Sequence, residues 1–302
     1  MSTPPPLVSV GLPVRNGGEV IEGALRSVLA QEHEDLELVI SDDASTDGTE
    51  EICRHYARSD SRVRYHRQPE NIGALANAAR VLHLARGTFL KWMGDDDWLA
   101  PSYLSRCLER HAADDRLILV TTQQVVLDED GQARTSSFPG CALASGRPLE
   151  RFTEILRKLA EGCLPLDPIH GLLRREPVAA IPRPTMLGDD EVFAAKLALA
   201  GPWGQVPEVL THRGWTTPAP TTQLARQLDV PALQSRATNL GQCRELLAYL
   251  HQVPLTPAEQ RAARAEVRRL YLRRQQRTAL RGCHKLIEFV RSDAELTPTE
   301  AG

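Results

Sequence analysis

A run of three carboxylates, Asp95–Asp97, is the part of this 302-residue chain best suited to chemistry. It follows an apolar segment, residues 88–93, and precedes the apolar pair 98–99. Adjacent carboxylates repel one another and resist desolvation, so a bound divalent cation or a strongly basic partner is the expected compensation. Their oxygen atoms suit Mg²⁺ or Mn²⁺. The alternative is a solvated acidic turn in which Asp97 caps the helix that begins near Pro101, but the apolar flanks disfavour full solvation.

A second acidic pair, Asp42 and Asp43, follows another apolar segment. Such a pair at the end of a strand can accept hydrogen bonds from the imide N–H of a nucleobase and from a ribose hydroxyl. Helix capping by Ser45, Asp47 or Thr49 explains part of this polar string. Asp42 and Asp43 come too early to be caps, so we expect them to bind a ligand.

A third acidic group, residues 189–191, opens a predicted helix over 190–200. The helix macrodipole favours carboxylates at that position, and this is a sufficient account of an isolated Gly-Asp-Asp-Glu string. A catalytic role would require one of these carboxylates to reach a substrate hydroxyl.

Alternating strands and helices must position these groups. Apolar and β-branched runs predict strands over residues 7–14, 36–40, 63–66, 88–93, 117–127 and 206–213. Amphipathic periodicity predicts helices over 21–29, 49–56, 74–85, 101–113, 151–160 and 190–200. This alternation implies mainly parallel pairing with helices on both faces of the sheet. Ligands bind such sheets beyond the carboxyl ends of the strands, where Arg15, Asp42, Asp43 and Asp95–Asp97 are expected.

Composition excludes several other classes of protein. Hydrophobic residues make up 42% and charged residues 25%, so disorder and collagen-like repeats are disfavoured. No long apolar run and no signal peptide are present, and the six cysteines form no C-x-x-C pair, so we expect a cytoplasmic protein. Residues 11–18 lack the G-x-G-x-x-G fingerprint of dinucleotide-binding domains, and neither a P-loop nor a G-x-S-x-G string occurs.

The net charge of -3 hides an asymmetry. Residues 223–302 hold 13 Lys+Arg and 8 Asp+Glu, whereas the preceding 222 residues hold 23 and 31. A capping box at Thr256 starts a helix to about Val290, in which residues 261–291 carry ten Lys+Arg and two Glu. This helix could contact anionic membrane, the acidic body, a second subunit or an acidic acceptor, but an apolar stripe packed within the chain is the simplest expectation. Nucleic acid is not an expected partner.

Four segments together resemble the family 2 glycosyltransferases with a GT-A fold: residues 8–16, 39–49, 71–77 and 95–98. The resemblance covers about residues 7–213. It implies a GT-A-like (Rossmann-like) α/β fold, with a mixed, mainly parallel sheet flanked by helices and a helical C-terminal extension. We expect a domain over 1–222, with a nucleotide-sugar half at about 7–100 and an acceptor half at about 101–222, followed by the extension 223–302.

The resemblance also implies a set of site residues. A nucleotide-sugar donor, usually a UDP-sugar, would contact Pro13, Val14, Arg15, Asp42, Asp43, Asn71, Gly73, Asn77 and Asp95. Mn²⁺ or Mg²⁺ would bind Asp96 and Asp97. Strand pleating instead puts Asp95 and Asp97 on one side, but the family's Asp-x-Asp-Asp-Trp pattern favours Asp96. Gly94 replaces the first Asp of that pattern, which affects the expected contacts to the donor sugar.

The resemblance also implies residues on the acceptor side of the site, although the match to the family is looser there. By resemblance Asp190 is the catalytic base, with Asp189 and Glu191 as competitors, and His212, Arg213 and Asp189 are candidate diphosphate or acceptor contacts. His170 is a candidate lining residue of the acceptor cleft. Arg67 and Arg80 are weaker candidates for phosphate contacts, since solvated strand or helix positions account for both.

The resulting prediction is a metal-dependent, inverting glycosyltransferase with an unknown acceptor. Peripheral contact with the inner face of a membrane, or a homodimer, would involve the C-terminal helices. A nucleotidyltransferase acting on a sugar phosphate and a non-catalytic sugar-nucleotide-binding protein are the alternatives.

Overall fold

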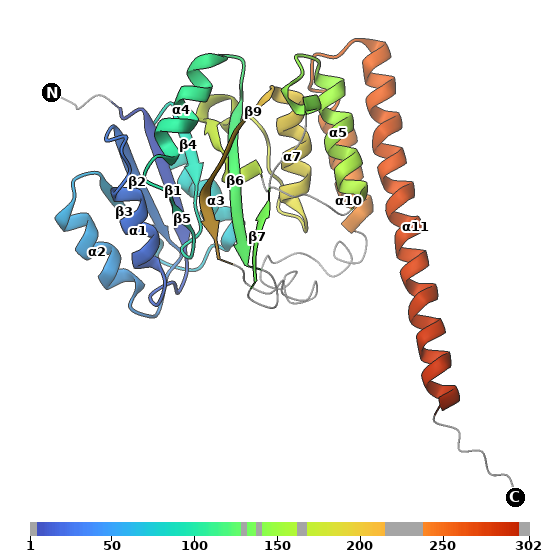
Figure 1. Ribbon diagram of the computed structural model, residues 1–302, viewed down its shortest axis with the longest axis horizontal. Helices are drawn as coiled ribbons and strands as arrows, with labels where there is room; N and C mark the ends of the chain where they lie inside the picture. Colours follow the sequence, from blue (N-terminus) through green and yellow to red (C-terminus); the bar gives the residue numbers. More distant parts are fainter. Residues whose placement is uncertain (1–4, 128–131, 137–140, 162–167, 215–237, 296–302) are drawn as a thin grey trace, which may run out of the picture.

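One mixed sheet organises the molecule. The computed structural model describes residues 5–127, 132–136, 141–161, 168–214 and 238–295. Within these residues the sheet has nine strands: β1 (Val8–Val14), β2 (Leu36–Asp42), β3 (Val63–Arg67), β4 (Phe89–Trp92), β5 (Trp98–Leu99), β6 (Leu119–Leu127), β7 (Ala133–Ser136), β8 (Leu172–Arg174) and β9 (Trp203–Arg213). Their order is β3-β2-β1-β4-β8-β6-β9-β5, with β7 paired to β6 (Figure 1).

The sheet is mainly parallel, as predicted. Strands β1 to β4 pair in parallel, and β6 pairs in parallel with β9. The short strands β5, β7 and β8 pair antiparallel with their neighbours. The sequence predicted none of these three strands, because segments of two to four residues show no usable periodicity.

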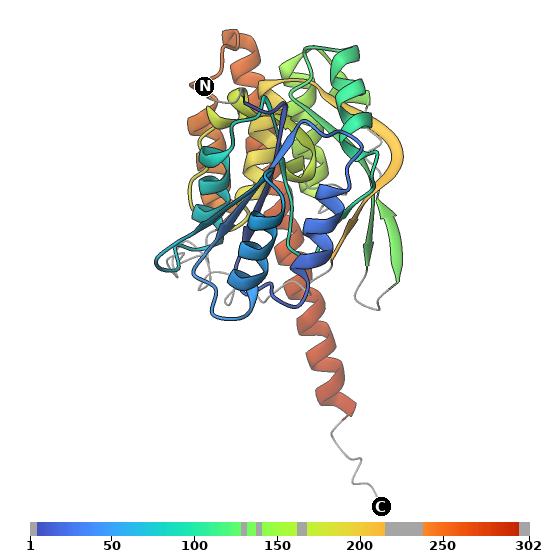
Figure 2. The ribbon, with the colours of Figure 1, turned by 90° about the vertical axis from the view of Figure 1, so that its left-hand side faces the viewer.

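Helices cover both faces of this sheet (Figure 2). They are α1 (Ile21–Leu29), α2 (Thr49–Ser59), α3 (Ala74–Leu84), α4 (Tyr103–Ala113), α5 (Pro148–Glu161), α6 (Arg175–Ala179), α7 (Asp189–Ala200), α10 (Thr238–Tyr249) and α11 (Pro257–Glu295), with 3-10 turns η1 (Cys141–Ala144) and η2 (Pro168–His170). The predicted helices are confirmed to within a few residues at their ends. Helix α6 was missed, since it lies at the start of a segment whose prolines favoured irregular structure.

Two apolar cores lie on opposite faces of the sheet. Residues from α1 and α4 form one core, and residues from α3, α5, α7, α10 and α11 form the other. The pleat explains the division, because neighbouring residues of a strand point to opposite faces. Thus Leu119 lies in one core and Val120 in the other, and Leu172 and Leu173 divide in the same way.

The carboxyl ends of β1, β2 and β4 lie at one edge of the sheet, the lower edge in Figure 1. Helix α7 ends at Ala200, three residues before β9 begins at the opposite, amino edge. Twelve helical residues span about 18 Å, so the first turn of α7 lies toward the carboxyl edge. The acidic groups predicted to do chemistry therefore share that edge.

The C-terminal helices pack on the rest of the chain. Thr256 and Glu259 form the predicted capping box, in which Glu259 Oε2 accepts from Thr256 N at 2.9 Å. Ala263, Val267 and Leu270 of α11 are at most 2% exposed in the core shared with α5. The expected packing of an apolar stripe within the chain is thus confirmed for this half of α11. Of the helical extension predicted over residues 223–302, residues 223–237 and 296–302 lie outside the described residues.

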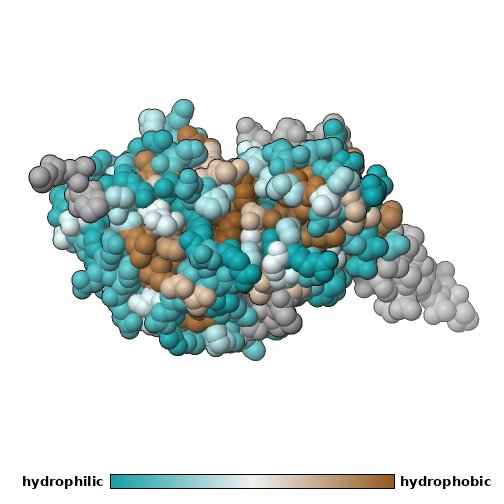
Figure 3. All heavy atoms as spheres, turned by 90° about the horizontal axis from the view of Figure 1, so that it is seen from above, coloured by the Kyte–Doolittle hydropathy of each residue, from teal (hydrophilic) through white to brown (hydrophobic). Residues whose placement is uncertain are grey.

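Helix α11 runs along α5 and continues past the sheet toward its carboxyl edge (Figures 1 and 2). Within the described residues, no helix combines the length and apolar character needed to cross a bilayer. The opposite end of the molecule, seen from above, is mostly hydrophilic at its margin with hydrophobic residues gathered mainly near the middle (Figure 3).

Candidate functional site

The loops after β1 and β2 are joined by hydrogen bonds between side chains and backbone. Asn16 N donates to Ser45 Oγ and Thr46 N donates to Asn16 Oδ1, both at 2.9 Å. Gly17 N and Gly18 N donate to side chains of the second loop in the same way. The residues that the sequence assigned to helix capping therefore also fix the first loop. Asn16 and Ala44 adopt positive φ angles of 57° and 54°, a strained conformation that is concentrated at functional sites.

Asp42 is buried among protein partners. Its side chain accepts hydrogen bonds from Ser45 N at 2.8 Å and from Tyr65 Oη at 2.5 Å. Arg67 lies 3.7 Å away and also pairs with Glu50, which agrees with a structural rather than a phosphate-binding role for this arginine. Burial and the Asp42 carboxylate together raise the pKa of Tyr65 far above its ordinary value. Asp42 thus stabilises the loop after β2 through its hydrogen bonds to Ser45 and Tyr65.

Asp43 connects β2 to the loop before α3. Its Oδ1 and Oδ2 accept the backbone N–H groups of Ile72 and Gly73 at 2.6 and 3.0 Å. Gly73 has a φ of 87°, which a residue with a side chain rarely adopts. Asn77 is 2% exposed and donates to Ser41 O at 2.8 Å and to Val14 O at 3.5 Å. Asp43 and Asn77 therefore hold three segments together at the sheet edge.

The remaining residues predicted to bind the donor fall into two groups. Arg15 and Asn71 are exposed, and Pro13 and Gly73 are half-buried beside them at the carboxyl edge. Val14 differs, since its side chain is 3% exposed and belongs to the core. Arg15, Asn71, Pro13 and Gly73 are therefore accessible to a ligand. Val14, Asp42 and Asn77 are buried and stabilise the loops that carry these residues.

The three carboxylates after β4 point in different directions. Asp97 is 3% exposed, and its Oδ2 accepts the Gly94 N–H at 2.9 Å. His170 Nδ1 lies 3.5 Å from Oδ2, and Arg213 Nε lies 3.8 Å from Oδ1. Asp97 therefore joins the acidic turn to η2 and to the end of β9, so its charge is already compensated by the protein.

Asp95 and Asp96 face other surroundings. An added Cβ at Gly17 would lie 2.3 Å from Asp95 Oδ2, and one at Gly214 would lie 1.9 Å from Asp96 Oδ2. Burial, with the neighbouring carboxylates, raises the pKa of Asp95 above its ordinary value. Asp96 is exposed, and no described side chain donates a hydrogen bond to either carboxylate.

This donor set fits a divalent cation. Within the described ranges, no three His, Cys, Asp or Glu side chains converge to form a closed metal centre. An exposed hard oxygen ligand beside a second, uncompensated carboxylate instead suits a cation whose other ligands come from substrate phosphates and water. Burial and existing partners separate Asp97 from Asp95 and Asp96, although the sequence grouped Asp97 with Asp96.

The end of β9 covers the acidic turn. His212 is paired with Trp98 across the antiparallel β5–β9 ladder, and their rings meet edge to face at 5.1 Å. Arg213 Nε is buried and makes no hydrogen bond to the described residues. A guanidinium beside the acidic turn can balance the charge of a diphosphate. The structure thus places His212 and Arg213 beside the acidic turn, at Trp98 and Asp97.

The first turn of α7 lies close to the same turn. Arg183 pairs with Asp189, and its guanidinium carbon lies 5.8 Å from the ring centroid of Trp92, the last residue of β4. Asp189 is 8% exposed, and Glu191 pairs with Arg274 at 2.9 Å. Asp190 is exposed at the start of α7. Of the three acidic candidates, Asp190 is therefore the one presented to solvent near the acidic turn.

Several supporting residues had no signal in the sequence. Arg183, which links Asp189 to Trp92 of β4, lies in a proline-rich segment without periodicity. Tyr65 lies on an edge strand and was not distinguished from other strand residues. Their roles depend on contacts between distant segments, so only a pairing of strands and helices in three dimensions could have identified them.

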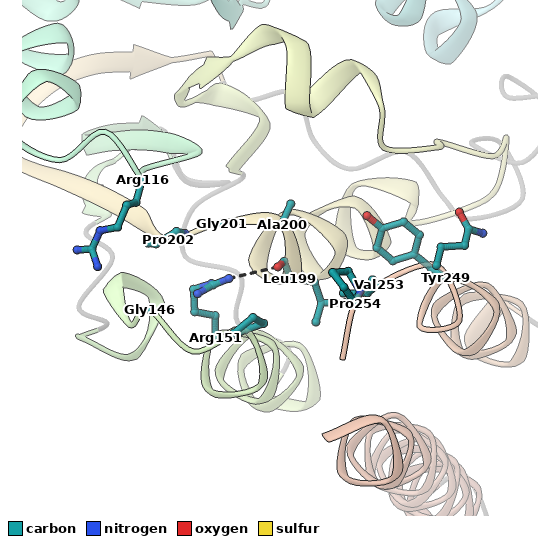
Figure 4. Close-up of a pocket in the computed structure, with 12 residues that line it drawn as sticks. Arg116, Gly146, Arg151, Leu199, Ala200, Gly201, Pro202, Tyr249, Val253 and Pro254 are labelled. Carbon is teal, nitrogen blue, oxygen red and sulfur yellow. Dashed lines mark hydrogen bonds between the residues drawn. The ribbon is translucent and has the colours of Figure 1, made fainter. Parts of the chain in front are cut away.

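A cavity of about 470 Å³ lies elsewhere, between the C-terminal end of α7 and the loops flanking it (Figure 4). Its lining includes Arg116, Pro202 and Tyr249. Arg116 and Pro202 precede β6 and β9, so the cavity is at the amino edge, away from the acidic groups. The guanidinium of Arg151 in this cavity donates to Ala198 O and Leu199 O at the end of α7, which leaves it a structural role.

Comparison with known sequences gives one family and several relatives. The profile of Glycosyl transferase family 2 matches residues 9–181. A chondroitin synthase of Escherichia coli is 33% identical over 134 residues, which are 44% of this chain and 19% of that protein. A Campylobacter jejuni GalNAc(5)-diNAcBac-PP-undecaprenol beta-1,3-glucosyltransferase is 32% identical over 106 residues, which are 35% of this chain and 34% of that protein. The matched segments thus span well under half of these relatives.

Solved structures share the fold at low sequence identity. Staphylococcus aureus TarS in complex with UDP-GlcNAc has a TM-score of 0.65 and 17% identity, covering 87% of this chain and 72% of that one. Glucosyl-3-phosphoglycerate synthase of Mycobacterium tuberculosis, in complex with Mn²⁺, UDP and glucosyl-3-phosphoglycerate, has a TM-score of 0.52 and 17% identity, covering 79% and 80%. Both are glycosyltransferase structures of the GT-A type, so the predicted fold is confirmed.

Proposed function

The chain belongs to glycosyl transferase family 2, and from this premise we propose that it transfers a sugar from a nucleotide-diphosphate sugar to an acceptor hydroxyl. The observation that carries the proposal is that Asp43, Asp96, Arg213 and Asp190 all lie toward the carboxyl edge of the sheet. A UDP-sugar is the proposed donor, supported by the UDP and UDP-sugar complexes of similar folds.

On the donor side, the nucleotide would lie across the ends of β1 and β2. Asp43, which is 2% exposed, holds the backbone of Ile72 and Gly73 in place at this edge, and the exposed Arg15 and Asn71 beside it would contact the nucleotide. Asp42 and Asn77 contribute by holding the loops that carry these groups. Pre-formed loops of this kind lower the ordering cost of binding.

Asp96 is the proposed metal ligand, with Asp95 next to it. Asp97 is proposed as a positioning residue, because its carboxylate is already occupied by Gly94, His170 and Arg213. Mn²⁺ or Mg²⁺ held there would offset the negative charge that develops on the departing nucleoside diphosphate. Arg213 would hold the same diphosphate from the side of β9, and His212 forms the adjoining wall.

On the acceptor side, Asp190 is the proposed general base. The acceptor oxygen forms a bond to the anomeric carbon of the donor while its proton passes to the Asp190 carboxylate. The bond between that carbon and the diphosphate oxygen breaks, and its electron pair leaves with the nucleoside diphosphate. One displacement of this kind inverts the configuration at the anomeric carbon. His170, beside Asp97, would face the acceptor.

A donor panel tests this proposal. Purified protein is incubated with several nucleotide sugars and either Mn²⁺ or Mg²⁺, and release of nucleoside diphosphate is measured. Asp190→Asn should keep UDP affinity and lose turnover, because the amide has no charge with which to take a proton. Full transfer by this variant would assign the base to another residue.

The same panel separates the alternatives. A nucleotidyltransferase would release pyrophosphate from a nucleoside triphosphate and a sugar phosphate. A non-catalytic binding protein would bind UDP and turn over no donor. Either result would contradict the proposed transfer.

A further inference from the structure

We propose that Gln242 of α10 and Arg274 of α11 are positioning residues for Asp190, so that the C-terminal helices complete the acceptor side of the site. This inference rests on the proposed function, since it takes Asp190 as the base. Gln242, Arg274 and Asp190 all lie beyond residues 9–181, the segment that matches the family.

The segment to be positioned is a tight turn at Gly188, the residue directly before α7. Gly188 has a φ of 66°, in the left-handed region that favours glycine. Because this turn sets the direction in which α7 begins, it also sets where the Asp190 carboxylate lies. Its conformation therefore needs support from outside the helix.

Gln242 of α10 stabilises this turn through hydrogen bonds to its backbone. It is 3% exposed, and its Nε2 lies 3.2 Å from Leu187 O, 3.1 Å from Gly188 O and 3.0 Å from Glu191 Oε2. An added Cβ at Gly188 would lie only 2.2 Å from this Nε2, so the contact is close. Gln242 thus binds the backbone of the turn on both sides of its bend.

Arg274 fixes the orientation of Gln242. One guanidinium nitrogen, Nη1, donates to Gln242 Oε1, and the other, Nη2, donates to Glu191 Oε2 at 2.9 Å. A guanidinium can only donate, so the Gln242 amide must present its oxygen to Arg274 and its NH₂ group to the turn. The Arg274 side chain is 12% exposed, and the same Nη2 lies 3.5 Å from Leu159 O of α5.

The two helices form a firm base for these contacts. Lys196 of α7 pairs with Glu245 of α10 at 2.6 Å, and Leu246 and Val267 are at most 1% exposed in the core. Gln242 differs from these packing residues because its amide binds the backbone of the turn, and Arg274 differs because it holds that amide and the Glu191 carboxylate. Their loss should therefore disturb the start of α7 more than it disturbs the core.

Arg274→Gln tests the proposal in the full-length protein, with Arg273→Gln as the matched control. Arg273 is exposed on the same helix, so the control removes the same charge without touching the turn. For Arg274→Gln we expect amide hydrogen exchange in residues 187–191 to rise by about tenfold, and kcat to fall by about tenfold with the donor KM within about twofold. Arg274→Lys, which keeps the charge but not the two-pronged geometry, should fall between.

Gly188→Ala provides a second variant that leaves α11 intact. Its Cβ would push against Gln242, so exchange in residues 187–191 should rise here also, with UDP affinity unchanged. The proposal is overturned if Arg274→Gln matches Arg273→Gln in both exchange and kcat, or if only its thermal stability changes. If the unmodified protein turns over no donor, the proposed function fails, and the exchange measurement still decides whether Gln242 and Arg274 hold the turn.

Discussion

Asp43→Ala should weaken UDP binding by removing the support of the loop before α3. The carboxylate accepts two backbone N–H groups, from Ile72 at 2.6 Å and from Gly73 at 3.0 Å. Hydrogen bonds to a charged group contribute about 1.5–3 kcal/mol each. Ile72 is 38% exposed, so water can replace part of the loss, and we take the lower value for both bonds. The sum of about 3 kcal/mol corresponds to about a hundredfold rise in the Kd of UDP.

Isothermal titration of UDP in the presence of Mn²⁺ measures this effect. Asp115→Ala is the control, since Asp115 is an exposed carboxylate between α4 and β6, at the amino edge. The control should keep the affinity of the unmodified protein. If folded Asp43→Ala binds UDP within about twofold of the control, Asp43 does not organise the nucleotide site in the way its hydrogen bonds imply.

Two further predictions concern stability. Glu37 is 2% exposed and accepts hydrogen bonds from the guanidinium groups of Arg64 and Arg86, so Glu37→Ala should lower the free energy of unfolding in urea by about 3 kcal/mol. A loss below about 1 kcal/mol would contradict the importance of this network. A separate effect comes from His111, whose pKa burial lowers from 6.5 to about 4. Between these two pH values the unfolded chain binds a proton at this histidine and the folded chain does not. The free energy of unfolding should therefore be highest above pH 6.5 and fall as the pH drops toward 4. Urea unfolding of His111→Gln between pH 7 and 5 should lack this slope, and a slope equal to that of the unmodified protein would exclude His111 as its source.

The sequence predicted the elements with long periodic patterns. Ile21, Ala24, Leu25 and Val28 follow helical spacing, and all four are at most 1% exposed. The parallel strands β1 and β2 are apolar runs that are visible without a structure. The antiparallel strands β5 and β8 are too short to carry a pattern, so the pairing of β8 with β4 and of β9 with β5 could not be predicted from the sequence.

The candidate site was predicted as a set of residues but not as a division of roles. Asp96 and Asp97 are adjacent and chemically identical, yet one is exposed and the other is buried between His170 and Arg213. Asp190 is exposed, whereas Glu191 is half-buried and pairs with Arg274, which lies 83 residues further along the chain. Burial and partner choice are properties of the folded chain, and spacing along the sequence does not encode them directly.

We propose that the chain catalyses a metal-dependent sugar transfer in which Asp96 is the metal ligand. The most direct test of this proposal is the release of UDP from a UDP-sugar by the unmodified protein and by Asp96→Ala, with Mn²⁺ and with a chelator. We predict release that depends on the cation for the unmodified protein, and loss of that release in Asp96→Ala. Equal, cation-dependent release by both proteins would contradict the assignment of Asp96, and release that persists in the chelator would contradict the requirement for a metal.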